Sequence, residues 1–292
     1  MIGELVRVWT EDGLQLQGLY CAPGATSDLP AVLHLHGACS NFYRSQFLDS
    51  LADELMERGQ AFLTGNTRGH DIMNSVYSRD PTATKRIGVA YEVFEECLLD
   101  IEAWLDFLVQ RGHGGTVLLG HSFGAHKAAF YQSERGDERV RGLILMSPAD
   151  QALWVEAMGS EAELMLSSAS EKVSSAQGDA LVHAGPAPYP LSARTLHSLF
   201  VTAKPDIFRF SKPDEPWQVV SRLGCAILIT MGTVAEFIST SPQAALATLK
   251  AKAVSSSRCD TVVLEGAPHN YRGHEAEVNK VIMGWLRDVF AG

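Results

Sequence analysis

Short apolar runs alternate with amphipathic stretches along most of this chain. The first two runs, residues 5–10 and 15–21, flank Glu11-Asp12-Gly13. An acidic residue followed by glycine between apolar runs indicates a hairpin, so we expect two antiparallel strands. We then expect strands at 31–36, 61–65, 116–119 and 142–146, and helices at 47–58, 92–110 and directly after residue 122. This alternation predicts a doubly wound, mostly parallel sheet with helices on both faces.

The alternation stops between residues 150 and 224. This segment contains helical stretches rich in Ala, Ser, Leu and Met, and two prolines, Pro213 and Pro216, precede the return to an apolar run at 225–231. A second run at 261–264 and an amphipathic helix at 275–290 complete the pattern. We therefore predict an α/β core made of residues 1–149 and 225–292, with residues 150–224 inserted as a helical lid.

Composition narrows the possible functions. The 292 residues are 46% hydrophobic and 20% charged, which is typical of a globular domain. The net charge of −10 and the lack of a dense Lys/Arg stripe argue against nucleic-acid binding, which needs a basic face. No apolar stretch approaches the roughly 18 residues of a membrane span. Glu4 and Arg7 interrupt the first apolar run, which is therefore unlike a signal peptide, and we expect a cytoplasmic protein.

The strongest chemical signal is Gly120-His121-Ser122-Phe123-Gly124. The pattern Gly-x-Ser-x-Gly is weak evidence alone, but here it follows the apolar run 116–119 and precedes the helix-compatible run 125–132. A strand, a sharp turn and a helix are the setting in which such a serine becomes a nucleophile. The two glycines are expected where larger side chains would collide with neighbouring elements. We therefore predict that Ser122 is a nucleophile.

A serine hydroxyl needs a base that removes its proton as it attacks. His269 is the best candidate, because it lies in a loop between the predicted strand 261–264 and the last helix. His274 is the nearby alternative, but it stands at the start of that helix. Attack by the serine would create a negative oxygen, the oxyanion, which needs preorganised hydrogen-bond donors. We expect the backbone N–H groups of Ala38 and Phe123 to be these donors.

The histidines and cysteines do not suggest a metal site. His34 and His36 have no carboxylate cluster beside them, so we expect them to orient the loop that contains Ala38. The five cysteines have no metal-ligand spacing, and we expect them to be free thiols that pack as small apolar residues. No cofactor and no metal are predicted.

Several segments together resemble a known family. They are His36-Gly37 with residues 41–43, and residues 66–70, 120–124, 147–150 and 268–271. These are similar to an α/β-hydrolase group that includes fungal siderophore esterases. The resemblance implies a carboxylic-ester hydrolase that acts on a small molecule such as a microbial secondary metabolite. Arg68, in the second segment, is expected to hydrogen-bond loop carbonyls rather than to contact substrate.

The acid that orients the histidine is not in its usual place. This superfamily usually has an aspartate three residues after the glycine that ends the strand, and counting from Gly232 gives Ala235. Alanine cannot accept a hydrogen bond. Glu236 follows immediately, and its extra methylene can compensate for a displacement of one residue. Asp150 is the main alternative, since some members of the superfamily supply the acid after the preceding strand. A Ser-His pair without an acid is the third possibility.

The predicted reaction is attack of Ser122 on an ester or lactone carbonyl, followed by hydrolysis of the acyl-enzyme. The same acyl-serine would serve an acyltransferase, a thioesterase or a cyclase. A ligand-binding protein with weakened catalysis is a further alternative, which the unusual Ala235 keeps open. The predicted lid offers apolar and aromatic surface to a large substrate through Trp154, Met158, Met165, Leu166, Tyr189 and Phe200. The oligomeric state is not predicted.

Overall fold

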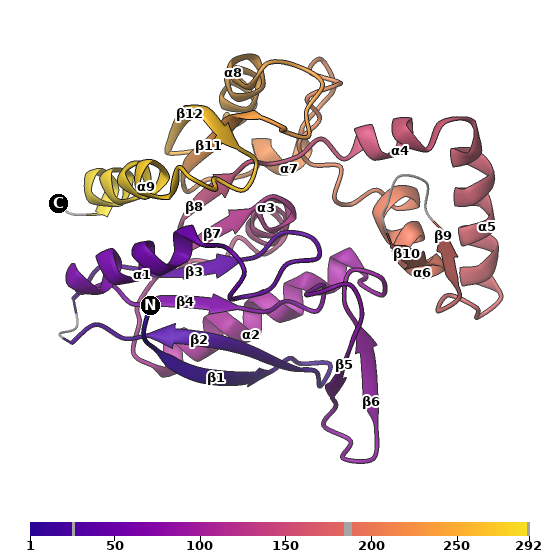
Figure 1. Ribbon diagram of the computed structural model, residues 1–292, viewed down its shortest axis with the longest axis horizontal. Helices are drawn as coiled ribbons and strands as arrows, with labels where there is room; N and C mark the ends of the chain where they lie inside the picture. Colours follow the sequence, from indigo (N-terminus) through magenta and orange to yellow (C-terminus); the bar gives the residue numbers. More distant parts are fainter. Residues whose placement is uncertain (25–26, 184–188, 291–292) are drawn as a thin grey trace.

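A central sheet of eight strands organises the computed structural model, which describes residues 1–24, 27–183 and 189–290 (Figure 1). The strand order is β1-β2-β4-β3-β7-β8-β11-β12. β1 and β2 form the predicted antiparallel hairpin, β2 is antiparallel to β4, and the other neighbours are parallel. The strands are β1 (Glu4–Trp9), β2 (Gln15–Cys21), β3 (Ala31–Leu35), β4 (Phe62–Gly65), β7 (Thr116–His121), β8 (Val140–Met146), β11 (Ala226–Val234) and β12 (Arg258–Pro268).

Helices cover both faces of this sheet, which confirms the predicted fold class. α1 (Phe47–Glu57) and α9 (Glu275–Phe290) lie side by side on one face (Figure 1). α2 (Cys97–Gln110), which the short helix η1 (Phe94–Glu96) precedes, packs on the other face with α3 (Phe123–Arg135) and α8 (Pro242–Lys252). Because successive side chains of a strand point to opposite faces, Leu33 joins the core beneath α2 and α3, whereas Val32 joins the core beneath α1 and α9.

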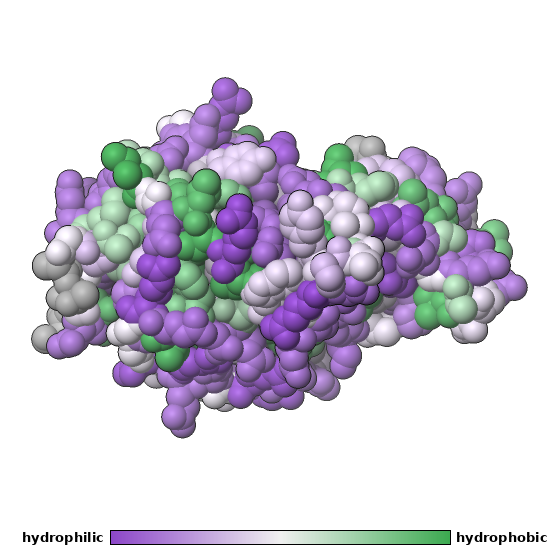
Figure 2. All heavy atoms as spheres, turned by 90° about the horizontal axis from the view of Figure 1, so that it is seen from below, coloured by the Kyte–Doolittle hydropathy of each residue, from purple (hydrophilic) through white to green (hydrophobic). Residues whose placement is uncertain are grey.

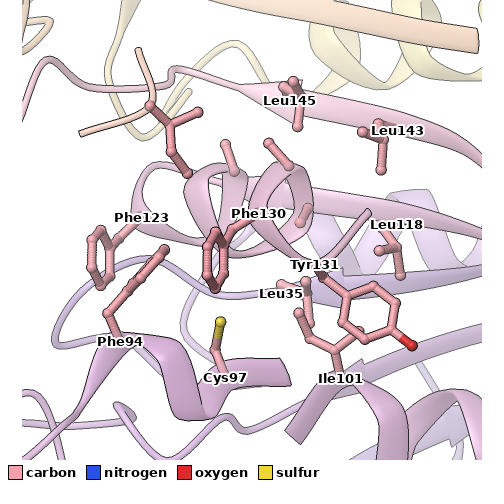
Figure 3. Close-up of a cluster of buried hydrophobic side chains, with 14 of the residues drawn as sticks. Leu35, Phe94, Cys97, Ile101, Leu118, Phe123, Phe130, Tyr131, Leu143 and Leu145 are labelled. Carbon is pink, nitrogen blue, oxygen red and sulfur yellow. The ribbon is translucent and has the colours of Figure 1, made fainter. Parts of the chain in front are cut away.

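Aromatic packing fixes the first turn of α3, which begins immediately after Ser122. The ring of Phe94 lies 5.3 Å from that of Phe123 and 5.1 Å from that of Phe130, measured between centroids. Figure 3 shows these three rings together beneath α3, next to Cys97. The position of the Phe123 backbone, and with it the turn that carries Ser122, therefore depends on a fully packed apolar contact.

Residues 150–224, called the inserted segment below, connect β8 to β11 and extend beyond the end of the sheet (Figure 1). The segment re-enters the core through Phe208, Phe210 and Trp217, which are buried. Its elements are α4 (Ala152–Met158), η2 (Gly159–Glu161), α5 (Ala162–Ser174), β9 (Leu181–His183), β10 (Pro190–Ser192), α6 (Ala193–Leu196), the π-helical turn η3 (His197–Val201) and α7 (Gln218–Ser221).

Several features were not predicted, among them the strand pair β9–β10 within the segment that was expected to be helical. The hairpin β5 (Asn74–Tyr77) and β6 (Thr84–Ile87) is mostly exposed and has no apolar run. α8 is rich in alanine and buries only a few side chains. β12 begins three residues earlier than expected, at the polar residues 258–260, because it is the edge strand and needs less apolar cover.

The surface is largely hydrophilic. Figure 2 shows apolar side chains gathered in separate patches on the face seen from below. No helix of the described residues is both long enough and apolar enough to cross a membrane. Within the described residues all five cysteines are free, and Cys21 and Cys97 are buried as predicted.

Candidate active site

A cavity of about 930 Å³ lies where the loops after the parallel strands meet. Ligands of open α/β sheets bind at this edge of the sheet. Ser122, His269, Ala38 and Phe123 all line the cavity, so the structure brings together four of the predicted site residues. Part of the wall comes from the inserted segment, through Leu153, Trp154, Ala157, Tyr189, Leu191, Leu199 and Phe200.

The turn at Ser122 is strained. Its backbone has φ 54° and ψ −120°, a conformation that residues with a side chain rarely adopt, and its N–H donates to the Met146 carbonyl at 2.8 Å. A Cβ atom on Gly120 would lie 2.3 Å from the Gly124 carbonyl oxygen, and one on Gly124 would lie 2.1 Å from the Leu35 carbonyl oxygen. Both glycines are therefore required for the turn to form against β3, for the reason that the sequence suggested.

His269 is held in one tautomer by Glu236. Its Nδ1 lies 2.7 Å from Glu236 Oε2, and because a carboxylate only accepts hydrogen bonds, Nδ1 carries the proton. Nε2 is then the basic nitrogen of the ring. The imidazole packs edge-on against Phe237 and beside His121, with ring centroids 4.8 Å and 5.2 Å away.

Glu236 reaches His269 because the chain turns sharply after β11. Ala235 has φ 54°, in the left-handed region, and the sheet register shifts between Gly232 and Val234. The Glu236 side chain folds back under the end of the strand, where Oε1 accepts a hydrogen bond from the Gly232 N–H at 2.8 Å. Only 3% of this side chain is exposed, so its carboxylate is desolvated and held by directed bonds.

Ser147 and Tyr271 form a layer behind Glu236 that the sequence did not reveal. The Ser147 hydroxyl lies 2.8 Å from Glu236 Oε1 and 2.8 Å from the Tyr271 hydroxyl, which also lies 2.9 Å from Thr230 Oγ1. Tyr271 is completely buried, and burial raises the pKa of its hydroxyl. The tyrosine is thus a neutral hydrogen-bonding group that links three segments beneath the acid.

His121 supports His269 through the backbone. His121 Nε2 lies 2.8 Å from the His269 carbonyl oxygen, so this nitrogen carries the proton and donates it to the hydrogen bond. Burial lowers the pKa of His121 to about 4, which keeps the ring neutral. Its place within the Gly120–Gly124 turn is the only sequence signal that could have singled it out.

Asp150 and His274 lie elsewhere. Asp150 is buried, and its Oδ1 and Oδ2 accept hydrogen bonds from the backbone N–H groups of Ala152 and Ser211, at 3.0 Å and 2.5 Å. It therefore fastens the start of the inserted segment to its later part. His274 Nδ1 lies 3.0 Å from Glu277 Oε2 on the outside of α9. Neither residue lines the cavity.

The loop that contains Ala38 is fixed by His36. The His36 Nδ1–H donates to the Gly37 carbonyl at 2.9 Å, and Nε2 accepts from the Thr67 N–H at 3.0 Å. Burial lowers the pKa of His36 far below its usual value, so the ring stays neutral. The chain then turns at Cys39, whose φ is 56°, and the Ser40 N–H donates to the Gly37 carbonyl.

A buried ion pair lies behind this loop. Lys127 Nζ, on α3, is 2.5 Å from Glu92 Oε1 and donates to Thr67 Oγ1 at 2.9 Å. Both charged side chains are 1% exposed. A pair of this kind depends on both partners, because removing one leaves an isolated buried charge.

Arg68 has a structural position. Its guanidinium is 3% exposed and forms ion pairs with Asp100, Glu96 and Asp12. It does not line the cavity that holds Ser122. Its partners are carboxylates rather than the loop carbonyls that we expected.

The histidines do not form a metal centre. His34 Nδ1 bonds to Thr64 Oγ1 at 2.9 Å, and burial lowers the pKa of His34 to about 3. The described residues contain no group of three or more His, Cys, Asp or Glu side chains arranged to hold a metal ion.

Comparisons with known proteins agree with this fold. Among solved structures, Est1E from Butyrivibrio proteoclasticus with bound ferulic acid is 17% identical to this chain, with a TM-score of 0.70. The match covers 98% of this chain and 100% of the Est1E chain. Monoglyceride lipase from Saccharomyces cerevisiae is 16% identical, with a TM-score of 0.66, and the match covers 99% of this chain and 96% of the lipase chain. The esterase Pf2001 from Pyrococcus furiosus is 15% identical, with a TM-score of 0.63, and the match covers 100% of this chain and 94% of the esterase chain.

At these identities the structural matches establish the fold alone. No curated protein sequence is significantly similar to this chain. The model of the α/β hydrolase family matches residues 32–281, which is most of the sequence and includes Ser122, Glu236 and His269. The chain therefore belongs to the α/β hydrolase family.

Proposed function

We propose that this protein is a serine hydrolase that cleaves a carboxylic ester or lactone through an acyl-Ser122 intermediate. The observation that carries the proposal is the 2.7 Å contact between Glu236 Oε2 and His269 Nδ1, on a histidine that lines the same cavity as the strained Ser122. Nucleophile, base and orienting acid are the three groups that this chemistry requires.

In the proposed reaction, His269 Nε2 takes the hydroxyl proton as Ser122 Oγ attacks the carbonyl carbon. The negative oxygen that forms accepts hydrogen bonds from the N–H groups of Ala38 and Phe123, at the start of α3, whose dipole also favours negative charge there. The tetrahedral intermediate collapses, and the leaving alkoxide takes the proton from His269. Water then attacks the acyl-enzyme by the same steps in reverse order.

The cavity favours hydrolysis over acyl transfer. Phe237, Arg44 and Arg272 line it and are exposed, so the cavity opens to solvent and water can reach an acyl group on Ser122. The inserted segment would act as the lid, with aromatic side chains against a large acyl or alcohol group. A secondary metabolite of microbial origin is one class of ester that would fit this volume.

The test is turnover of p-nitrophenyl esters by the wild type and by Ser122→Ala, with Ser174→Ala as the control. Ser174 is an exposed serine on α5, so its loss removes a hydroxyl without touching the cavity. We expect Ser122→Ala to lose activity by at least about 10³-fold and to lose labelling by a fluorophosphonate probe. Equal rates in the wild type and Ser122→Ala would overturn the proposal. Product analysis with an added alcohol would reveal acyl transfer.

A further inference from the structure

Two arginines give the cavity a charge opposite to that of the whole chain. The chain carries a net charge of −10, yet Arg44 and Arg272 line the cavity and no aspartate or glutamate lines it among the described residues. Apart from histidines, the two guanidinium groups are the charged side chains of this wall. A positive cavity on an acidic protein favours anionic ligands.

The two arginines lie in loops that lead into neighbouring helices. Arg44 lies three residues before α1, and Arg272 lies three residues before α9. These two helices pack side by side (Figure 1). The rings at the two helix entrances, Phe47 and Tyr271, have centroids 6.3 Å apart, and the Asn279 amide of α9 donates to the Phe47 carbonyl at 3.1 Å.

Both guanidinium groups have donors to spare. Arg44 Nη1 donates to the Cys39 carbonyl at 3.3 Å, which keeps this side chain beside the Ala38 loop. The Arg272 side chain forms no hydrogen bond or ion pair with any described residue. The nearby Glu275 carboxylate instead accepts the Gly273 N–H at 3.0 Å. Neither arginine forms an ion pair with a carboxylate of the described chain.

The rest of the cavity is apolar on the side of the inserted segment. Trp154, Leu199 and Phe200 line that wall. A guanidinium group matches a carboxylate in shape, charge and hydrogen-bonding pattern. The cavity thus combines an apolar surface with a cationic rim, and Ser122 lines the same cavity.

From this arrangement we infer the substrate class: esters that carry a carboxylate, which Arg44 and Arg272 bind at the cavity rim while the apolar part of the substrate packs against the inserted segment. The inference rests on the proposed function, because it concerns the substrate of the same site. It does not depend on whether the carboxylate belongs to the acid or to the alcohol part of the ester.

The experiment uses two matched pairs of esters. Mono-p-nitrophenyl adipate and its terminal amide place the charge in the acyl part, and 4-acetoxybenzoate and 4-acetoxybenzamide place it in the leaving group. The readout is the ratio of kcat/KM for the anionic ester to that for its neutral partner. A ratio cancels any general loss of activity or folding, because such a loss affects both esters equally.

We expect the wild-type ratio to exceed one in at least one pair. Arg44→Gln and Arg272→Gln should each lower that ratio by about 2- to 5-fold, the range for one charged contact at a partly exposed site, and the double variant should lower it further. Arg7→Gln is the matched control, because Arg7 is exposed on β1, far from the cavity, and its loss changes the net charge equally. Salt should reduce the preference by screening.

The two proposals fail in different ways. If all four esters are turned over in a Ser122-dependent manner but the ratio is at or below one in both pairs, or is unchanged in the double variant, the inferred substrate class is wrong and the proposed function stands. If the protein hydrolyses no ester of either pair and is not labelled at Ser122 by a fluorophosphonate, the proposed function is wrong and the inference falls with it.

Discussion

Glu236 Oε2 and His269 Nδ1 are 2.7 Å apart, although Glu236 stands four residues after Gly232 rather than three. The left-handed backbone of Ala235 and the longer side chain together make up for the displaced position. The contact between this carboxylate and the imidazole is thus fitted to one length of side chain.

Shortening that side chain should be costly. Glu236→Asp withdraws the carboxylate by about 1.5 Å, the length of one C–C bond. We expect kcat to fall by about 10- to 100-fold in Glu236→Asp, and by about 10³- to 10⁴-fold in Glu236→Gln, whose amide can leave the histidine in the wrong tautomer. Steady-state kinetics on one p-nitrophenyl ester would measure this. Glu265→Asp, an exposed glutamate on β12, is the control. If Glu236→Gln kept full activity, Glu236 would have no role in the mechanism.

Asp150→Asn should affect stability more than catalysis. The substitution weakens two hydrogen bonds from backbone N–H groups to a buried carboxylate, which are worth roughly 1–3 kcal/mol together. For a chain of this size we expect the Tm to fall by about 2–8 °C, while kcat of the folded protein changes by less than about 5-fold. Differential scanning calorimetry and kinetics on the same sample test both parts. A loss of rate as large as that of Glu236→Gln would make Asp150 the acid instead.

Ser147→Ala removes the hydroxyl that joins Glu236 to Tyr271. The Glu236 carboxylate keeps its bond from the Gly232 N–H, so the acid should remain near the histidine but with more freedom. We expect kcat to fall by about 3- to 30-fold with little change in KM, because substrate does not touch Ser147. Tyr271→Phe should have a smaller effect on kcat. An unchanged kcat in Ser147→Ala would show that the Gly232 contact is enough.

Removing Lys127 should destabilise the whole fold. Lys127→Met leaves the buried Glu92 carboxylate without its partner, at a cost of about 3–5 kcal/mol. The Tm should fall by roughly 6–15 °C. The double variant Lys127→Met with Glu92→Leu removes both charges and should recover much of this loss. Calorimetry of the wild type, the single variants Lys127→Met and Glu92→Leu, and the double variant measures this recovery, and additive losses in the double variant would contradict the pairing.

Acid should destabilise the protein through its buried histidines. Burial lowers the pKa of His34 to about 3 and those of His121 and His126 to about 4. The unfolded chain therefore binds more protons than the folded chain between about pH 4 and pH 6.5. Stability should be full above pH 6.5 and decrease as the pH falls below it, by up to about 1.4 kcal/mol per pH unit for each histidine.

Chemical denaturation between pH 7 and pH 5 would measure this dependence, because most carboxylates stay ionised in that window. His126→Asn should flatten the slope, since it removes one group that the fold keeps neutral. A slope equal to that of the wild type would mean that His126 already accepts a proton in the folded state.

Periodicity was enough to predict the parallel core, because its central strands β3, β4 and β7 are largely apolar runs that are buried on both faces. The hairpin β5–β6 escaped prediction, since its side chains are mostly exposed and its pairing depends on backbone hydrogen bonds. The same limit applies to the site. Ser122 and His269 are marked by local motifs, whereas Ser147 and Tyr271 meet only because three separate segments converge.

Asp150 shows why the sequence left the acid open. Both Asp150 and Glu236 are carboxylates in loops that follow adjacent strands, and each is buried. Only their hydrogen-bond partners differ, and those partners, Ser211 for one and His269 for the other, are more than 30 residues away in the chain. No local sequence pattern therefore indicates which of the two carboxylates contacts the histidine.

The inserted segment leaves the sheet at a point that is separate from the proposed reacting groups. The segment departs after β8, whereas Ser122 follows β7, Glu236 follows β11 and His269 follows β12. The part of the cavity wall that the inserted segment supplies can therefore change in length without moving any strand that carries a proposed reacting group. Substrate preference can then change within one continuous stretch of the chain as well as at Arg44 and Arg272, which lie outside it.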